Sequence, residues 1–388
     1  MPWKKVSQKA PRWAFIETVL HTYAGFAGVC REHGISRKTG YKWWQRFEQS
    51  GRRGLQERSR RPRRLARSWP RWLHLAVQKL RRAHPTWGAR KLCWALRQHW
   101  PRRALPHPRT LERWAPRVPR RHRARPGPCL PALDRQLAHR PNDVWTIDFK
   151  GWFRTADGTR IEPLTVRDLY SRQVLLVRHV RPASDAAVRP VLARVFRRYG
   201  LPRTIRVDNG APFGGCGALG LSTLSVWWLH LGVRVDFTRR AHPQDNGAHE
   251  QMHRILKAET AKPPAATATA QYRRFQRWRR AYNQARPHEA LGLQLPAAHY
   301  LPSPRRYPRG LRPWHYPPHC PVRRVSHGGW IHWEGRRRLI GRAFAAEDIC
   351  LRADDGFHRI FLGPHLIGEL HPHDLGGLRP AHRSNSKT

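Results

Sequence analysis

The stretch NDVWTIDFKGWF, residues 142–153, decides how the middle of the chain folds. Its apolar residues alternate, which puts Trp145, Ile147 and Phe149 on one face of an expected β-strand. Asp148 then lies in mid-strand on the opposite face. The strand therefore presents an acid on the side that its aromatic residues do not cover.

The sequence on the C-terminal side of this strand continues as an α/β pattern. Two strands around a turn and then a helix are expected at residues 161–168, 173–179 and 183–199. The short strand TIRVD ends at Asp208 and opens into an Asn-Gly turn. A helix through LSVWWLHL, a strand VRVDF, and a turn and helix in HPQDNGAHEQMHRILKAE complete the region. Strands followed by alternating helices and strands predict an α/β fold with a mixed sheet.

Three acids stand at defined places in this pattern: Asp148, Asp208 and Glu250. Glu250 begins a helix, and 41 residues separate it from Asp208. Two strand carboxylates and one helix carboxylate can converge on divalent cations, because Mg²⁺ or Mn²⁺ takes hard oxygen ligands and coordinates substrate phosphates. Each acid alone is a weak signal, since Asp208 also suits a turn and Glu250 a helix start. Composition leaves three further acids open, Asp157, Asp168 and Asp236.

The helix that carries Glu250 is expected to be two-sided. At about 100° per residue, Glu250, Arg254 and Lys257 share one face, with His253 at its edge. The apolar residues point the other way, into a core: Met252, Ile255 and Leu256. We therefore expect Glu250 to face a cleft beside cations that hold DNA phosphates.

The charge of the whole chain points to a polyanionic partner. It carries 75 Lys and Arg against 25 Asp and Glu, a formal net charge of +50. Residues 1–140 alone hold 35 basic and 6 acidic residues, a concentration that indicates a phosphate-binding surface. No apolar run is long enough for a membrane span and no secretory leader is recognised, so we expect a cytoplasmic, nucleoid-associated bacterial protein. None of the six cysteines forms a Cys-x-x-Cys pair, so neither a zinc knuckle nor a disulfide framework is expected.

The N-terminal region has the pattern of a helix-turn-helix. A first helix is expected to bury Ile16, Val19, Leu20 and Tyr23, a second covers residues 26–33, and a glycine turn leads to a third that Ser36 caps. The third helix is expected to bury Trp44 and Phe47 and to enter a DNA major groove. An ordinary helical bundle with a solvated basic face is the alternative. The expected DNA-binding residues are Arg37, Lys38, Lys42, Gln45 and Arg46, together with Arg254 and Lys257 of the later helix.

The whole chain is expected to be multidomain. Its expected parts are an all-α helix-turn-helix domain at 1–67, a second helix-turn-helix-like domain at 68–120, a basic Pro-rich linker at 121–141, an α/β core at 142–302, a Pro-rich linker at 303–318, a small all-β barrel at 319–375 and a disordered tail at 376–388. Residues 52–64 are expected to be a basic arm that follows phosphates. The C-terminal barrel is expected to fold separately and to contribute to DNA or subunit contacts rather than to chemistry.

Three blocks carry a family resemblance. TIDFKGWF, TIRVDNGAPF and HPQDNGAHEQMHRILKAE resemble the three acidic motifs of bacterial insertion-sequence transposases with a retroviral-integrase-type core. YNQARPHEALGLQLP resembles the segment that closes such a core, and GISRKTGYKWWQRF and PSPRRYP also match. The nearest group is the family numbered four-eighty-one. The resemblance covers nearly the whole chain, and its acidic blocks come in the family's order.

The resemblance implies a ribonuclease-H-like core with a DDE triad at Asp148, Asp208 and Glu250, which holds Mg²⁺ or Mn²⁺. It implies DNA strand cleavage and transfer: water frees a 3′-hydroxyl at the element's end, and that hydroxyl is directed at target DNA. The implied partners are double-stranded DNA, as terminal inverted repeats and as target, and further copies of the chain in a dimer or larger assembly. The spacing before Glu250 is longer than usual in such cores, so an insertion, GGCGALGLS, is expected to loop out.

Two alternatives remain open from the sequence. One is a catalytically inactive DNA-binding protein derived from a transposase. The other is a nuclease of the same fold that cleaves RNA–DNA hybrids, although helix-turn-helix modules would then have no evident purpose. The chain also has Ala241, Ala248 and Gln251 where the family is expected to carry glycine or arginine-rich variants, which bears on DNA contacts more than on the acids.

Overall fold

The computed structural model describes residues 9–57, 69–115, 138–215, 217–239, 247–373 and 377–379. The chain divides into two compact units, Met1–Pro70 and Arg71–Thr388, and each is described by itself. Most of the expected linker at 121–141, about half of the expected basic arm at 52–64 and most of the expected tail at 376–388 lie outside the described residues. Within the described ranges, no helix combines the length and the hydropathy needed to cross a membrane.

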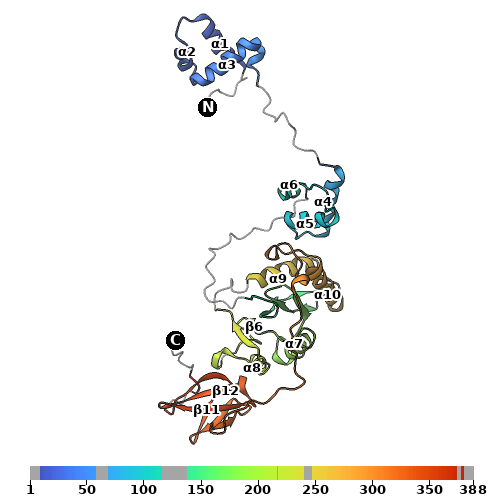
Figure 1. The fold of residues 1–388 in the computed structure, drawn as a ribbon, viewed down its shortest axis with the longest axis vertical. Coiled ribbons are helices and arrows are strands. Elements are labelled where there is room, and N and C mark those ends of the chain that lie inside the picture. The colour runs from blue at the N-terminus through green and yellow to red at the C-terminus, as the bar shows by residue number, and fades with distance from the viewer. Residues whose placement is uncertain are drawn as a thin grey trace. The chain divides into compact units, whose positions relative to one another are not determined.

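The first unit contains three helices, α1 (Lys9–His21), α2 (Phe26–Glu32) and α3 (Arg37–Ser50), and a short 3₁₀ helix, η1 (Gly51–Leu55) (Figure 1). Ser36 caps α3 as predicted, because its hydroxyl accepts a hydrogen bond of 3.2 Å from the backbone N–H of Thr39. Residues 51–55 are folded as well, and Leu55 is buried in the core of this unit. The predicted start of the basic arm at residue 52 is therefore too early.

The buried faces of α1 and α3 differ from those predicted. Leu20 and Tyr23 are exposed, and Phe15 is fully buried beside Ile16. In α3 the buried indole belongs to Trp43, whereas Trp44 and Phe47 are only partly buried. The reason is the position of Gly40, which lies one turn before Trp43 and lets α3 approach α1 and α2 closely.

Three further helices begin the second unit: α4 (Arg71–Ala83), α5 (Ala89–His99) and α6 (Pro108–Trp114). The loop between α4 and α5 reaches the C-terminal end of a helix in the α/β core. The hydroxyl of Thr86 donates to the carboxylate of Glu259, and Arg286 donates to Thr86 at 2.8 Å and to Glu259 at 3.1 Å. The predicted second helical block is thus joined to the core by hydrogen bonds between Thr86 and the Arg286–Glu259 ion pair of the core.

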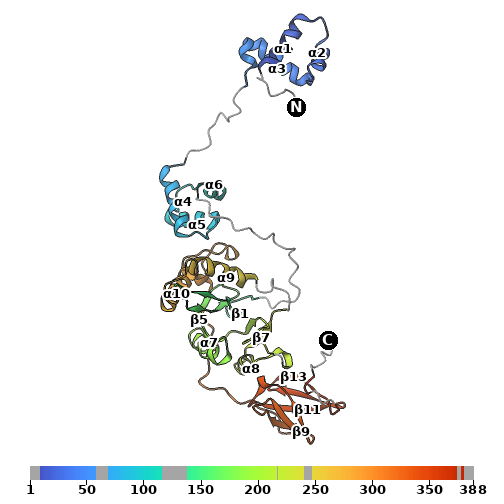
Figure 2. The same cartoon turned by 180° about the vertical axis from the view of Figure 1, so that it is seen from behind.

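The α/β core is built on a five-stranded sheet with the order β5-β4-β1-β6-β7 (Figures 1 and 2). Its strands are β1 (Val144–Phe149), β4 (Pro163–Asp168), β5 (Val174–His179), β6 (Thr204–Val207) and β7 (Arg234–Phe237), and the short strands β2 (Phe153–Arg154) and β3 (Arg160–Ile161) form a separate hairpin. β4 pairs antiparallel with β1 and with β5, while β1, β6 and β7 are parallel. The predicted mixed sheet is confirmed.

Helices cover both faces of this sheet. Trp145 and Ile147 point into the larger core, which α7 (Asp185–Tyr199) and α8 (Thr223–His230) complete. The other face packs on α9 (Gly247–Thr260) and α10 (Ala268–Gln284), as Figure 2 shows. Asp148 lies on this second face, opposite the aromatic side of β1, as its alternation predicted.

The C-terminal segment is all-β except for one 3₁₀ turn. Its strands are β8 (Val322–Arg324), β9 (Trp330–Trp333), β10 (Arg336–Leu339), β11 (Asp348–Asp354), β12 (Phe357–Leu362) and β13 (His365–Leu370), and the turn is η6 (Arg342–Phe344). They form a four-stranded sheet in the order β13-β12-β11-β8 and a two-stranded sheet of β9 and β10. An all-β module is therefore present, while its closure into a barrel stays a prediction.

This β module shares a hydrophobic cluster with the core, and the expectation that it folds separately stays a prediction. Leu221, Val226 and Leu229, from α8 and the loop before it, are buried in one cluster with Ile349 and Phe344 of the module. The expected insertion supplies part of this contact, because it folds back through a bridge between Gly214 and Leu221. Since α8 is apolar on two sides, it needs a second partner besides the sheet.

A disulfide joins Cys320 and Cys350 inside the β module, with Cα atoms 6.1 Å apart. The sequence predicted none, because 30 residues separate these cysteines and no spacing motif links them. The pairing of β8 with β11 brings them together, since it sets Cys350 opposite Val322. Cys30 and Cys93 are buried free thiols.

Gly40 provides a test of the first unit. A Cβ at Gly40 would lie 2.5 Å from the Cys30 sulfur and 3.2 Å from both Phe15 and Phe26, so we expect Gly40→Ala to destabilise the helix-turn-helix by about 1–3 kcal/mol. The measurement is hydrogen exchange of the backbone amides of residues 9–57 in the full chain. Gly28→Ala is the matched control: it also adds a methyl group within a helix but meets nothing within 4 Å. Equal loss of protection in both variants would contradict the steric explanation.

Candidate active site

Asp148 and Asp208 lie at the ends of two neighbouring strands. Asp148 belongs to β1, and Asp208 directly follows β6. The strands run parallel, with Thr146 opposite Arg206. The same register continued by two residues brings Asp208 beside Asp148, at the carboxyl ends of the strands, where open α/β sheets bind their ligands.

Glu250 comes to this place from α9. It lies in the first turn of the helix and is exposed, while Met252 and Leu256 are buried against the second face of the sheet. Arg254 and Lys257 are exposed on the same helix. The strand-end acids and the helix acid thus face one region from two layers of the core.

The charges of these acids act on one another. The pKa of Asp148 is raised to about 7, first because burial penalises its charged form, then because of the negative charges of Asp208 and Glu250. The ammonium group of Lys150 partly opposes this. Burial also raises the pKa of Asp208. Asp148, on which the charges of Asp208 and Glu250 act, has the donor chemistry that a divalent cation neutralises.

The other acids that composition left open have structural partners instead. Asp168 accepts a hydrogen bond of 2.7 Å from the backbone N–H of Asn142. Asp236 forms an ion pair of 2.6 Å with Arg206. Asp157 lies exposed in the turn between β2 and β3. None of these contacts points to the strand ends where Asp148 and Asp208 meet.

Behind Asp148 lies a buried polar network that the sequence did not predict. His249 and His253 of α9 both contact the hydroxyl of Thr165, each through Nε2 at 2.7 Å. His253 Nδ1 lies 3.6 Å from a carboxylate oxygen of Asp148. His253 was predicted at the edge of the exposed face, but it is 4% exposed and turns toward the sheet. The available signal was the i, i+4 spacing of the two histidines, which puts both on one helix face.

Both histidines are neutral. Burial lowers the pKa of His253 to about 3, and the nearby cations Lys150 and Arg167 add to the effect. Burial also holds the pKa of His249 well below its usual value. The imidazoles therefore add no positive charge beside Asp148.

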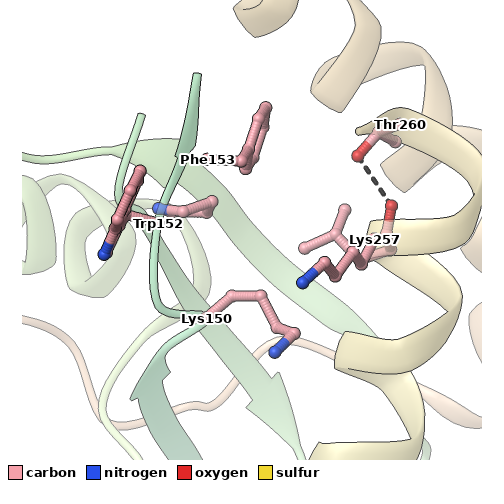
Figure 3. Close-up of a pocket in the computed structure, with 7 residues that line it drawn as sticks. Lys150, Trp152, Phe153, Lys257 and Thr260 are labelled. Atoms are coloured by element: carbon pink, nitrogen blue, oxygen red, sulfur yellow. Dashed lines mark hydrogen bonds between the residues drawn. The ribbon is translucent and has the colours of Figure 1, made fainter. Parts of the chain in front are cut away.

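A small pocket lies between the loop after β1 and α9 (Figure 3). Lys150 follows β1 and Lys257 lies on α9, and their ammonium groups point into the same space. Apolar groups form the rest of its lining: Trp152, Phe153, Pro163 and Leu256, with Thr260 beside them. Lys150 was not among the residues predicted for the site, although it follows Asp148 by only two positions. The pocket therefore offers two cations, and the charge of one of them, Lys150, acts on Asp148.

The predicted DNA-binding residues of α3 lie on its surface with one exception. Arg37, Lys38, Lys42 and Gln45 are exposed. Arg46 is partly buried, and its guanidinium lies over the ring of Trp43, 4.9 Å from the centroid. Four of the five side chains are thus exposed on one helix, although the Lys42 ammonium also lies over the Trp43 ring, 4.9 Å from its centroid.

Family models match the two parts of the chain that this geometry singles out. Integrase core domain models match residues 138–243 and 231–296, and a helix-turn-helix domain model matches residues 26–63. Two insertion-element proteins are also similar. An uncharacterized protein of element IS407 from Burkholderia multivorans is 29% identical over 179 residues, which cover 46% of this chain and 62% of that protein.

The chain carries an integrase core domain and a helix-turn-helix domain, and it is similar to insertion-element proteins. An uncharacterized protein of element IS476 from Xanthomonas euvesicatoria is 28% identical over 232 residues, which cover 58% of this chain and 63% of that protein. The chain thus matches less than two thirds of the length of either relative. The Gag-Pol polyprotein of avian reticuloendotheliosis virus is 31% identical over 128 residues, 10% of its own length.

Two solved structures resemble parts of the chain. The catalytic core domain of HTLV-2 integrase, in a complex with magnesium, has a TM-score of 0.34 and 14% identity, and it covers 42% of this chain and 100% of that one. A chain of the simian T-cell lymphotropic virus intasome has a TM-score of 0.36 and 16% identity over 76% of this chain and 100% of that one.

The raised pKa of Asp148 predicts a pH-dependent stability. A carboxyl group with a raised pKa stabilises the fold below its ordinary pKa near 3.8, and this contribution is lost as the pH rises through about 7. Asp148→Asn removes the charge that burial and the neighbouring acids disfavour, so we expect it to raise the free energy of unfolding by roughly 2–4 kcal/mol at pH 8 and by almost nothing at pH 4.

Urea unfolding in the presence of a chelator measures both values. Asp355→Asn, at an exposed turn, is the control and should change neither. A stabilisation by Asp148→Asn that is the same at both pH values would contradict the assigned repulsion.

Proposed function

We propose that this protein is a transposase, a DDE enzyme that cleaves DNA at the ends of an insertion element and transfers the freed strand to target DNA. What supports the proposal is that the charges of Asp208 and Glu250 both act on Asp148 at the strand end. The proposed catalytic residues are therefore Asp148, Asp208 and Glu250. The integrase core matches and the insertion-element relatives support the same reaction class.

The three carboxylates would hold Mg²⁺ or Mn²⁺. Their oxygens are hard ligands, and their mutual repulsion, which raises the pKa of Asp148, favours occupation by a divalent cation. A bound pair of such cations supplies activation of the attacking oxygen and stabilisation of the leaving one. The neutral state of His249 and His253 keeps positive charge away from the carboxylate that would bind them.

The residues around the acids would hold the DNA strand. Lys150 and Lys257 face the pocket of Figure 3, and Arg254 is exposed on α9, so all three can contact phosphates. In the first step a water oxygen forms a bond to phosphorus, and the 3′-oxygen of the strand leaves as a hydroxyl. In the second step that hydroxyl attacks a phosphodiester of target DNA and displaces another 3′-oxygen.

The partners would be double-stranded DNA and further copies of the chain. The exposed basic face of α3 suits recognition of the terminal inverted repeats through a major groove. Pairing of two element ends calls for a homo-oligomer of at least two copies. The family number four-eighty-one, the cytoplasmic location and the nucleoid association stay predictions.

Replacement of Lys42 by alanine tests the recognition helix. If Lys42 contacts a base edge, we expect the variant to bind the element's ends more weakly by about 1–3 kcal/mol while its binding to unrelated DNA is retained. A phosphate contact would instead weaken all sequences alike and reduce the salt slope by about one. The measurement is a binding titration at several salt concentrations, with Arg31→Ala of α2 as a control that removes the same charge. Binding unchanged at every salt concentration would exclude this helix from the interface.

Glu250→Gln tests the catalytic proposal. The amide has nearly the same size as the acid but is a neutral and poor ligand for a hard cation, so we expect cleavage and joining to fall by roughly a hundredfold or more. Binding to the element's ends should change by less than about twofold, because Arg254 and Lys257 remain. A cleavage gel with magnesium and a binding titration at the same salt give both values.

Two outcomes would redirect this proposal. Wild-type cleavage by Glu250→Gln would remove Glu250 from the triad. Glu259 could not then simply replace it, because its carboxylate already accepts from Trp278 at 2.6 Å and from Arg286 at 3.1 Å. End binding without cleavage by the wild-type chain would favour the inactive DNA-binding alternative. Glu334→Gln, at an exposed turn of the β module, is the matched control and should cleave normally.

A further inference from the structure

The polar network behind Asp148 is built into the register of the sheet. Thr165 of β4 is the cross-strand neighbour of Asp148, and Thr146 lies two residues before Asp148 on the same face. The hydroxyl of Thr146 contacts His249 Nδ1 at 2.6 Å, and the hydroxyl of Thr165 contacts both His249 Nε2 and His253 Nε2 at 2.7 Å. All four side chains are at most 4% exposed. The network therefore joins two strands and one helix, and it is shielded from solvent.

The protons in this network can be placed by elimination. An ionised carboxylate only accepts, so the favourable tautomer of neutral His253 carries its proton on Nδ1, toward Asp148. Nε2 of His253 must then accept, and the hydroxyl of Thr165 is its donor. That hydroxyl accepts in turn from Nε2–H of His249, whose Nδ1 accepts from Thr146. In this assignment each group donates its proton to the next one, in the order Thr146, His249, Thr165, His253 and Asp148.

The opposite placement of the protons leaves two lone pairs facing each other beside Asp148. The Thr165 hydroxyl also lies 3.0 Å from the backbone oxygen of Asp148, and it has only one proton to donate. If it donates there, both histidines must donate to it, and the lone pair of His253 Nδ1 then faces the Asp148 carboxylate 3.6 Å away. Ionised Asp148 therefore favours the first assignment.

We propose that Thr146, His249, Thr165 and His253 form a hydrogen-bonded relay that points the Nδ1–H of His253 at Asp148 and so orients this carboxylate for binding a divalent cation. These four are positioning residues, because all of them are buried behind Asp148 and act through it. The inference rests on the proposed function, since it concerns the same carboxylate. Burial supports it, because solvent does not compete for the hydrogen bonds of the four side chains.

A direct metal site on the histidines fits the contacts less well. Asp148, His249 and His253 offer ligand atoms within 4.8 Å of one another. However, both Nε2 atoms are already occupied by one hydroxyl, and they lie 3.1 Å apart. A cation bound between them would have to displace Thr165. Zinc on these histidines is therefore an outcome of the test and not the proposal.

The test compares Thr165→Val, which keeps the shape and removes the hydroxyl, with Thr165→Ser, which keeps the hydroxyl. Mn²⁺ binding to the full chain without DNA is measured by calorimetry, with Asp148→Asn as the control for the site. We expect Thr165→Val to weaken Mn²⁺ binding by about 10- to 100-fold and Thr165→Ser to stay within about threefold of wild type. In cleavage assays, Thr165→Val should raise the half-saturating Mg²⁺ concentration more than it lowers the rate at saturation.

Several results would overturn the relay. One is Mn²⁺ binding by Thr165→Val that equals wild type. Another is zinc that copurifies with the wild-type chain and is lost in His249→Ala, which would make the cluster a metal site. A wild-type chain that binds Mn²⁺ no better than Asp148→Asn would overturn it too. If Thr165→Val does not fold, as judged by thermal melting, His253→Phe is judged by the same binding criterion.

Failure of the proposed function would look different. A wild-type chain that binds Mn²⁺ with the expected order of variants, yet cleaves no DNA ends, would exclude the strand-transfer activity and still support the relay.

Discussion

Parallel pairing of β1 with β6 is the constraint on which the candidate active site of this protein depends. It sets Asp148 and Asp208 side by side at the carboxyl ends of two neighbouring strands, although the two acids are far apart in the chain. Like charges so placed repel, and the raised pKa of Asp148 reflects this together with burial. The fold tolerates the repulsion because the apolar core lies on the other face of β1, where Trp145 and Ile147 are fully buried.

Much of this arrangement could be predicted from the sequence, because alternation and helical periodicity are local properties. The face of β1 that carries Asp148 and the buried face of α9 at Met252 and Leu256 follow from periodicity alone. What periodicity could not supply was the register between strands. It gave no sign that Thr165 lies opposite Asp148, and so none that His253 turns inward to meet both.

The other differences from the sequence-based expectations have the same origin. Trp43 is buried in place of Trp44 because Gly40 allows a close helix contact that no single helix reveals. Cys320 and Cys350 meet because of one strand pairing. In each case a contact between distant segments decided which of two adjacent side chains, or which of several cysteines, found a partner.

The helix α9 is held at both of its ends. Near its start, His249 and His253 bind the sheet through Thr165, and near its end Glu259 binds Trp278 and Arg286. The carboxylate of Glu250 is thus carried by a helix with little freedom to slide along the sheet. Rigid support of this kind suits an acid that must stay aligned with two strand-borne partners.

The shared cluster between α8 and the β module bears on how such proteins can diversify. A module with a hydrophobic core of its own can be exchanged between proteins as a unit. Here, however, Ile349 and its neighbours in the β module cover Val226 and Leu229 of α8. Substitutions on either side must therefore be accommodated by the other. We expect the catalytic core and the β module of related elements to have been inherited together, with their contact residues changing in concert.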